Sequence, residues 1–290
     1  VITVVRGCVT WAVEKREYFC LASGHAGNLP HGILVRGMER TSTLGITLGT
    51  PVRMNRSEIR FGGGSVRIDI GEAATWSPAL APARRGSWHQ RCVQQASDIL
   101  SSRAPNRRGL AHLFPYVRDL AAGAVPRESV DFIEQRLASG LRDIVAAIRA
   151  RDGTTFLSAA ALLVGTGVGL TPSGDDVLLG VICGLMARGA LTRPPKDWLA
   201  TPLRRLPNHF QGRTTAMSEA LLLHATEGRF PERLLDFVNS LESGDAATVE
   251  DAAQALSTFG SSSGREMALG TLVAGMAFDT SGHQRRQCVA

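Results

Sequence analysis

One stretch of the chain joins a flexible backbone to two adjacent acids: GTGVGLTPSGDDVLLG, residues 165–180. Alternate glycines let backbone N–H groups converge on a ligand, because glycine adopts positive φ at little cost. The apolar run after Asp175 and Asp176 predicts a helix, and a helix start favours phosphate or carboxylate. A carboxylate there repels an anion unless a metal ion or a substrate N–H group lies between them. The stretch therefore predicts an anion site in which both aspartates coordinate Mg²⁺ or accept hydrogen bonds from a substrate amide.

The same residues also suit an ordinary helix start. Ser173 would be the N-cap and Asp176 the acid at N3 of a capping box, and acids in a first turn are favoured by the helix dipole. Adjacent helical side chains project about 100° apart, so the two aspartates are not an obvious acid–base pair. Neither a Walker A loop nor a Rossmann fingerprint fits, because no GK[ST] follows and the segment before the loop predicts a helix.

A second stretch repeats this pattern. SGREMALGTLVAGM, residues 263–276, aligns without a gap with SGDDVLLGVICGLM, residues 173–186. The main coincidences are Ser173 with Ser263, Gly174 with Gly264, Asp176 with Glu266, and Gly180 with Gly270. Small residues at matching positions let two helices pack closely. The hypothesis is that both helix starts flank one anion site; the alternative is two unrelated capping sequences.

A third candidate is GRTTAMSEALL, residues 212–222. Arg213, Thr214 and Thr215 enter a predicted helix, where a guanidinium and two hydroxyls could point at an oxyanion. The alternative is a threonine N-cap with the arginine in solvent.

Other polar and aromatic residues carry weaker signals. His25, Asn28 and His31 in GHAGNLPHG could reach the same cleft, although a turn or surface role is commoner for such residues. Trp76 and Trp88 are expected to pack in the core or between domains.

The cysteines predict no metal site or disulfide framework. Their number is five, with no CxxC spacing, which favours reduced and mostly buried thiols. Cys183 lies in an apolar helix pattern and is expected in the core.

The elements that must position these loops change character along the chain. Short β-branched runs separated by turn residues predict strands at 1–5, 18–22, 32–36, 45–49 and 66–70, with FGGGS at 61–65 as a hairpin turn. Apolar periodicity then predicts helices at 87–103, 126–150, 155–165, 213–228, 231–244, 246–260 and 263–279. We expect an α+β protein with a small antiparallel β domain (barrel or sandwich) over 1–80 and a mostly helical domain over 87–280. A connector is expected at 76–86 and a flexible tail at 281–290.

Composition is that of a soluble globular protein. The 290 residues are 44% hydrophobic and 20% charged. No apolar run is long enough to span a membrane, and the N-terminal residues lack the basic and apolar regions of a secretory signal. We therefore expect a cytoplasmic protein without membrane contact. The net charge is +6, but its arginines are dispersed and form no basic stripe interleaved with aromatics. This argues against nucleic acid and suits small anionic substrates.

Taken in order, the loops resemble a bacterial family formerly of unknown function, which includes one subunit of the oxamate carbamoyltransferase of anaerobic allantoin degradation. The likeness rests on GTGVGLTPSGDDVLLG, on RTT with Ser218 before EALLLHATEG, and on FGSSSGREMALG at 259–270, with GNLPHGILV and ATWSP in the N-terminal part. The third block departs from the family pattern G-H-S-S-G-x-D, because Ser261 replaces the histidine and Glu266 the aspartate.

The resemblance implies carbamoyl transfer between carbamoyl phosphate and the amide nitrogen of oxamate, by an enzyme of several different subunits. Residue chemistry then suggests Asp175 or Asp176 as the group that orients the amide or acts as base, with Mg²⁺ as the metal they could hold. The anion-binding candidates are Gly167, Gly169, Thr171, Ser173, Gly174, Arg213, Thr214, Thr215, Ser262, Ser263 and Gly264. Two other functions stay open: a Mg²⁺-dependent kinase or ligase that uses a nucleotide, and a non-catalytic subunit that binds a metabolite.

Overall fold

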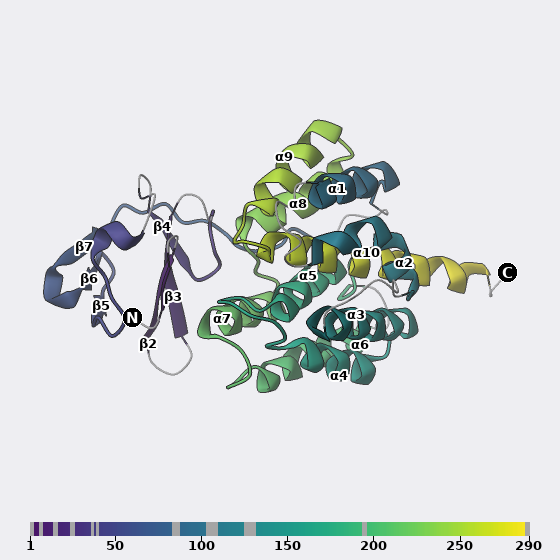
Figure 1. Ribbon diagram of the computed structural model, residues 1–290, viewed down its shortest axis with the longest axis horizontal. Helices are drawn as coiled ribbons and strands as arrows, with labels where there is room; N and C mark the ends of the chain where they lie inside the picture. The colour runs from purple at the N-terminus through teal and green to yellow at the C-terminus, as the bar shows by residue number, and fades with distance from the viewer. Residues whose placement is uncertain are drawn as a thin grey trace. The chain divides into compact units, whose positions relative to one another are not determined.

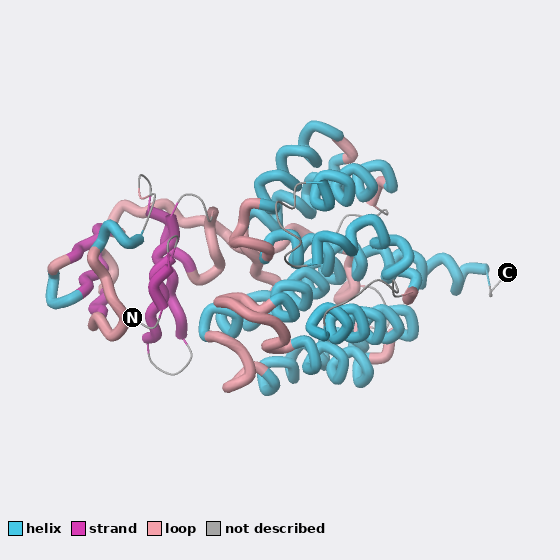
Figure 2. Tube along the Cα trace, viewed as in Figure 1, coloured by secondary structure: helices cyan, strands magenta, loops and turns pink. Residues whose placement is uncertain are grey.

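The computed structural model describes residues 3–5, 8–13, 17–23, 27–35, 38, 41–82, 88–102, 110–124, 132–192 and 196–287. The chain divides into two compact units, Val1–Ala79 and Leu80–Ala290. The strands lie in the first unit and the α-helices in the second (Figure 2). This arrangement confirms the predicted α+β class.

The first unit contains two small sheets. One has the order β1 (Thr3–Val5), β2 (Cys8–Val13), β3 (Glu17–Ser23) and β4 (Gly32–Val35). The other consists of β5 (Val52–Met54), β6 (Glu58–Phe61) and β7 (Val66–Asp69). Neighbouring strands are antiparallel except β3 and β4, which are parallel, so the expectation of a purely antiparallel domain is wrong for that pair.

The two sheets share one hydrophobic core. Trp11 of β2 meets Phe61 of β6 edge to face, with ring centroids 5.5 Å apart, and both side chains are fully buried. In the described part of the unit the sheets are separate, so they pack as layers and do not close into a barrel. The glycines of FGGGS turn the chain between β6 and β7, as predicted. The strand expected at 45–49 is wrong, because Gly45 and Gly49 take positive φ and form turns there.

The second unit is helical. Its α-helices are α1 (Gln90–Ser102), α2 (Val117–Ala122), α3 (Phe132–Ala150), α4 (Gly153–Leu163), α5 (Ser173–Ala187), α6 (Asp197–Arg205), α7 (Ala216–Thr226), α8 (Glu232–Ser243), α9 (Ala246–Ser257) and α10 (Ser263–Gln287). The helices α2 and α6 are short and were not expected. The last helix, α10, continues to Gln287, where a flexible tail was expected from residue 281. Residues 126–131 of the helix predicted at 126–150 lie outside the described part.

The helices α5 and α10 lie side by side at the centre of this unit (Figure 1). A Cβ on Gly180 would overlap the carbonyl oxygen of Met267, and one on Gly270 would overlap that of Val177. The hydroxyl of Thr271 bridges the helices by donating to the carbonyl of Gly180 at 3.1 Å. The close packing predicted from the aligned glycines is therefore confirmed.

The same pair is held again near its far end. Arg188, just after α5 and almost fully buried, donates to both carboxylate oxygens of Asp279 on α10 at 3.1–3.2 Å. Its guanidinium also lies over the ring of Trp88, 5.4 Å from the centroid. Trp88 is buried against Gly275, which confirms the prediction that it packs in the core or between domains. Trp76, for which the same role was expected, is half-buried in the first unit.

The cysteines only partly follow the sequence prediction. Cys92 and Cys183 are free and buried, and burial raises the pKa of the Cys183 thiol. Cys20 takes part in a disulfide, so the expectation of reduced thiols is wrong for this residue. Disulfide formation depends on which sulfur atoms the fold brings together, and spacing along the chain does not reveal this.

Among the helices that the structure describes, none has the length and apolar character needed to cross a membrane.

The glycine contact between α5 and α10 gives a stability prediction. Gly180→Ala should lower the free energy of unfolding by about 3 kcal/mol, because its methyl group meets backbone that cannot move aside without separating the helices. Urea denaturation followed by circular dichroism measures this.

Gly140→Ala in α3 is the matched control. Its Cβ would meet only the side-chain end of Leu163, which can rotate away. The gain in helix propensity, about 1 kcal/mol, should largely offset the strain there. Equal effects of the two substitutions would contradict the importance of the contact.

Candidate functional site

The loop before α5 has the backbone that its glycines predicted. Gly165, Gly167 and Gly169 adopt φ values of 73°, 121° and 103°. A Cβ on Gly165 would overlap the carbonyl of Arg213, and one on Gly167 would lie 2.7 Å from the amide nitrogen of Ser173. These two glycines are therefore required by close packing as well as by conformation.

The helix α5 begins differently from the capping-box prediction. Pro172 is its N-cap, with a carbonyl that accepts from the amides of Asp175 and Asp176 at 2.9 and 3.2 Å. Ser173 is the first helical residue and therefore follows the N-cap, so its predicted N-cap role is wrong. Proline at this position suits a helix start, because it has no N–H to satisfy.

Asp175 connects three segments. One carboxylate oxygen accepts from the amide of Gly165 at 2.8 Å, and the other accepts from the hydroxyl of Thr214. The side chain is almost fully buried. Burial raises its pKa, and the hydrogen bonds from Thr214 and Gly165 oppose that rise. The geometry gives Asp175 a positioning role.

The start of α10 meets the start of α5. The hydroxyls of Thr171 and Ser263 lie 2.8 Å apart and are hydrogen-bonded. Ser262, just before α10, donates to Glu266 at 3.3 Å. The hydroxyl of Ser263 is also hydrogen-bonded to Asp176, and the hydroxyl of Ser173 is hydrogen-bonded to Glu266. Thr171, Ser173, Ser262 and Ser263 thus form one group, which we call the hydroxyl layer.

Two buried acids, Asp176 and Glu266, lie beneath the hydroxyl layer. Each side chain is 1% exposed, and each keeps one carboxylate oxygen without a hydrogen-bond partner, Oδ2 of Asp176 and Oε1 of Glu266. Burial, followed by the charge of Glu266, raises the pKa of Asp176 well above 3.8. Burial likewise raises the pKa of Glu266. The pair therefore favours protonation, since two adjacent buried carboxylates cannot readily both ionise.

The segment 212–215 lies beside the loop, but its polar groups are largely engaged. Arg213 donates to the carbonyl of Ala161 at 2.7 Å. Thr215 is the N-cap of α7, accepts from the amide of Ser218 and donates to the carbonyl of Leu170. Together with the Thr214–Asp175 bond, these contacts fix the loop in place.

Of the predicted residues, the structure brings together Thr171, Ser173, Asp176, Ser262 and Ser263. Gly174 and Gly264 pack against carbonyls of the preceding helices, at Leu163 and Leu256. Glu266 is the site residue that the prediction left out of its list, although its alignment with Asp176 was the signal that could have found it. Asn28 and the buried His31 belong to the first unit, and His25 lies outside the described residues.

The proposed Mg²⁺ ligands do not form a typical carboxylate cluster. Both oxygens of Asp175 accept hydrogen bonds from protein donors. Across the described residues there is no group of three His, Cys, Asp or Glu side chains suited to a metal ion.

The fold and site define a two-unit α+β chain whose helical unit has a pair of helix starts over two buried acids. Residues 163–275 match the family model described as oxamate carbamoyltransferase subunit AllH. The chain is therefore similar, over this segment, to a family that includes that subunit, as its loops predicted. No solved structure matches this chain.

The two aspartates should respond oppositely to amidation. Asp175→Asn replaces an acceptor oxygen by a donor and leaves a buried donor without its partner, which should cost about 2 kcal/mol of folding stability. Asp176→Asn removes a buried group that is costly to ionise, so the variant should be at least as stable as wild type near neutral pH. Urea unfolding of both proteins measures this contrast.

The pH dependence provides a second readout for Asp176. Because its folded pKa lies above 3.8, the folded state binds the proton more tightly, and stability falls as pH rises from about 4 through the raised pKa. Asp176→Asn should flatten this fall. An unchanged slope would contradict burial of an ionisable Asp176. Asp143→Asn on the exposed face of α3 should leave the slope unchanged.

Proposed function

We propose that this chain is a subunit of a carbamoyltransferase and that its reaction site is the hydroxyl layer at the starts of α5 and α10. The family similarity over residues 163–275 supports the class of enzyme. The observation that carries the location is the 2.8 Å contact between Thr171 and Ser263, which joins two helix starts directly above Asp176 and Glu266.

The layer suits the phosphate group of carbamoyl phosphate. Two helix N-termini favour negative charge, and hydroxyls can donate to phosphate oxygens. Protonation of the acid pair removes the repulsion that two carboxylates would otherwise exert. A protonated acid also donates to its neighbouring hydroxyl, so that the hydroxyl hydrogen can turn outward to the phosphate.

The acid pair also suits the nitrogen chemistry. When phosphate cleaves oxalurate, a phosphate oxygen forms a bond to the carbamoyl carbon and the bond from that carbon to the oxamate nitrogen breaks. The departing nitrogen must gain a proton, because an amide anion is a poor leaving group. We propose that the pair supplies this proton through the hydroxyls of Ser263 and Thr171, and takes it back in the reverse direction.

Asp175 then acts as a positioning residue rather than a base. Its bonds to Gly165 and Thr214 hold the loop against the start of α5. Arg213 keeps further guanidinium N–H groups beyond its bond to Ala161, and these can reach a carboxylate at the edge of the layer.

Other subunits are expected to complete the enzyme. The similar family is described as a subunit, so turnover is proposed for the assembled complex. A non-catalytic metabolite-binding role would use the same layer and differ by the absence of turnover in that complex.

Calorimetric titration with phosphate and carbamoyl phosphate tests the location. Ser263→Ala should weaken phosphate binding about tenfold, the equivalent of one hydrogen bond to a charged group, about 1.4 kcal/mol. Ser261→Ala, two residues earlier and exposed, should leave the affinity unchanged. Equal effects of the two variants, or binding of ATP in place of carbamoyl phosphate, would contradict the proposal.

Activity of the assembled complex tests the proton transfer. Asp176→Asn should bind phosphate about as tightly as wild type, because the neutral amide, like the protonated acid, does not repel the anion. It should lose most of the phosphate-dependent cleavage of oxalurate, because the amide cannot supply the proton. Activity that survives in Asp176→Asn would contradict the assigned role.

A further inference from the structure

The three-stranded sheet of β5, β6 and β7 (Figure 1) carries three arginines in register. Arg53 lies opposite Arg60, and Arg60 lies opposite Arg67. Residues directly opposite each other in antiparallel strands point to the same side of the sheet. Ile59 and Phe61, which flank Arg60, are buried in the core, so the three arginines lie on the solvent side. We call them the arginine row.

The fold creates this row from residues that are dispersed along the sequence. Its members are seven residues apart, and two turns bring them together. In the first turn, the side-chain oxygen of Asn55 accepts from the amides of Ser57 and Glu58, both at 2.9 Å. The glycines at 62–64 form the second turn.

The guanidinium groups of the row are accessible. The side chains of Arg60 and Arg67 are 50% and 63% exposed, and both form ion pairs with Glu58, at 2.5 and 2.7 Å. Since a guanidinium has five N–H donors, these ion pairs use only some of them. Arg53 is exposed, and no described residue forms an ion pair or a hydrogen bond with its side chain.

The stability of the sheet does not account for the row. Like charges directly opposite each other destabilise a sheet, and the one carboxylate of Glu58 pairs with Arg60 and Arg67 but not with Arg53. Arginines on the edge strands β5 and β7 could prevent edge-to-edge association. Arg60 lies on the central strand, where such protection is not needed. A binding surface explains all three positions.

A hollow of about 310 Å³ lies at one end of the row. Its lining comprises Arg53, Met54, Asn55, Glu58 and Arg60. A carboxylate that enters this hollow would meet Arg53 and Arg60 and would fit the planar donor groups of a guanidinium.

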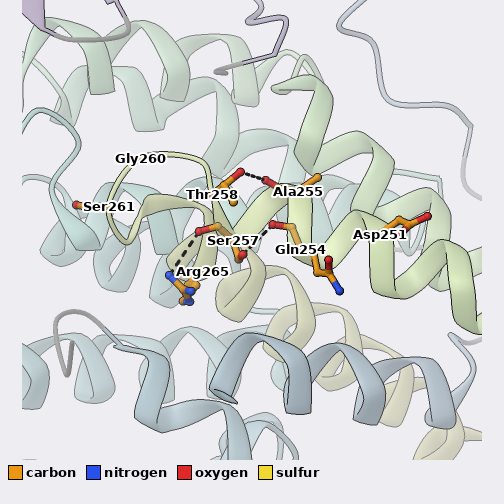
Figure 3. Close-up of a pocket in the computed structure, with 8 residues that line it drawn as sticks. All are labelled: Asp251, Gln254, Ala255, Ser257, Thr258, Gly260, Ser261 and Arg265. Carbon is orange, nitrogen blue, oxygen red and sulfur yellow. Dashed lines mark hydrogen bonds between the residues drawn. The ribbon is translucent and has the colours of Figure 1, made fainter. Parts of the chain in front are cut away.

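Another hollow, of about 610 Å³ at the end of α9, does not offer an equivalent cation (Figure 3). Its arginine, Arg265, is 9% exposed and donates to the carbonyl of Ser257, so its guanidinium is held within the chain.

We propose that the arginine row is a docking surface for an acidic helix of a partner protein, which presents carboxylates along one face. Neighbouring strands are about 4.8 Å apart, so the row spans about 10 Å. Acids at positions i, i+4 and i+7 of a helix share one face and span about 10.5 Å. Acids at alternate positions of a strand would span about 13 Å, which fits less well.

The composition of the surface favours a protein partner over nucleic acid. Glu58 lies among the arginines and would repel a continuous phosphate backbone, and the lining of the hollow includes no aromatic residue on which a base could stack. This inference does not depend on the reaction proposed for the hydroxyl layer.

Fluorescence anisotropy with two labelled, hydrocarbon-stapled helical peptides tests the docking surface on the full chain. One peptide carries three glutamates at i, i+4 and i+7, and its isomer carries the same three glutamates at adjacent positions. The spaced peptide should bind at least fivefold more tightly than the isomer, because only its carboxylates match the row.

Substitutions then locate the binding. Arg53→Gln should weaken binding of the spaced peptide at least fivefold. Arg118→Gln, an exposed arginine of α2 with the same change of charge, should leave it unchanged. Glu58→Gln should strengthen binding about threefold, because it removes the carboxylate that competes for Arg60 and Arg67. Glu72→Gln, at an exposed position of the same unit, should not.

Several outcomes would overturn the proposal. These are the absence of binding by the spaced peptide, equal affinities of the two isomers, or equal effects of Arg53→Gln and Arg118→Gln. A single-stranded DNA oligonucleotide that binds more tightly than the spaced peptide, and loses this binding in Arg53→Gln, would instead assign the row to nucleic acid.

Discussion

Gly180 and Gly270 bring the backbones of α5 and α10 into direct contact, and the candidate site depends on that contact. Each glycine lies against a carbonyl of the opposite helix, so a larger side chain at either position would force the helices apart. Such a displacement would separate Ser173 from Glu266 and Ser263 from Asp176. The hydroxyl layer exists because the two helix starts are held together by this contact and by the Arg188–Asp279 ion pair farther along.

The close approach creates an electrostatic cost at the same time. It buries Asp176 and Glu266 near one another, and ionised carboxylates are costly to remove from water. Protonation lowers that cost, and the nearby hydroxyls and helix dipoles oppose it only in part. In the proposed function, an acid pair that holds a proton more tightly than an exposed carboxyl gives this proton to the departing nitrogen without repelling phosphate.

The helix pair α4 and α5 and the helix pair α9 and α10 share one arrangement at their loops. Gly174 packs against the carbonyl of Leu163, and Gly264 packs against that of Leu256. Beyond this shared part the two pairs differ, because Asp175 accepts a hydrogen bond from Thr214 and Arg265 lines an open pocket.

Much of this arrangement could be predicted from the sequence, because the signals were local. The α+β class followed from short β-branched runs and helical periodicity, and the helix pair followed from the alignment of 173–186 with 263–276. The correspondence between the α4–α5 unit and the α9–α10 unit was not predicted. The first loop has additional residues, 168–170, which interrupt the alignment of the two loops. The strands β5 (VRM) and β6 (EIRF) each contain a single β-branched residue beside charged ones, so they lack the β-branched runs on which the strand predictions rested. The parallel pairing of β3 with β4 could not be predicted, because the sequence does not show which way neighbouring strands run. The N-cap was misassigned because Pro172 and Ser173 both suit a helix start.

A crystal structure with bound arsenate, a phosphate analogue whose arsenic atom gives an anomalous signal, tests directly whether the hydroxyl layer binds phosphate. If it does, the anomalous peak will lie within hydrogen-bonding reach of both the Ser173 and the Ser263 hydroxyls, outside the buried acid pair. A peak elsewhere, with none at the starts of α5 and α10, would contradict the proposed site.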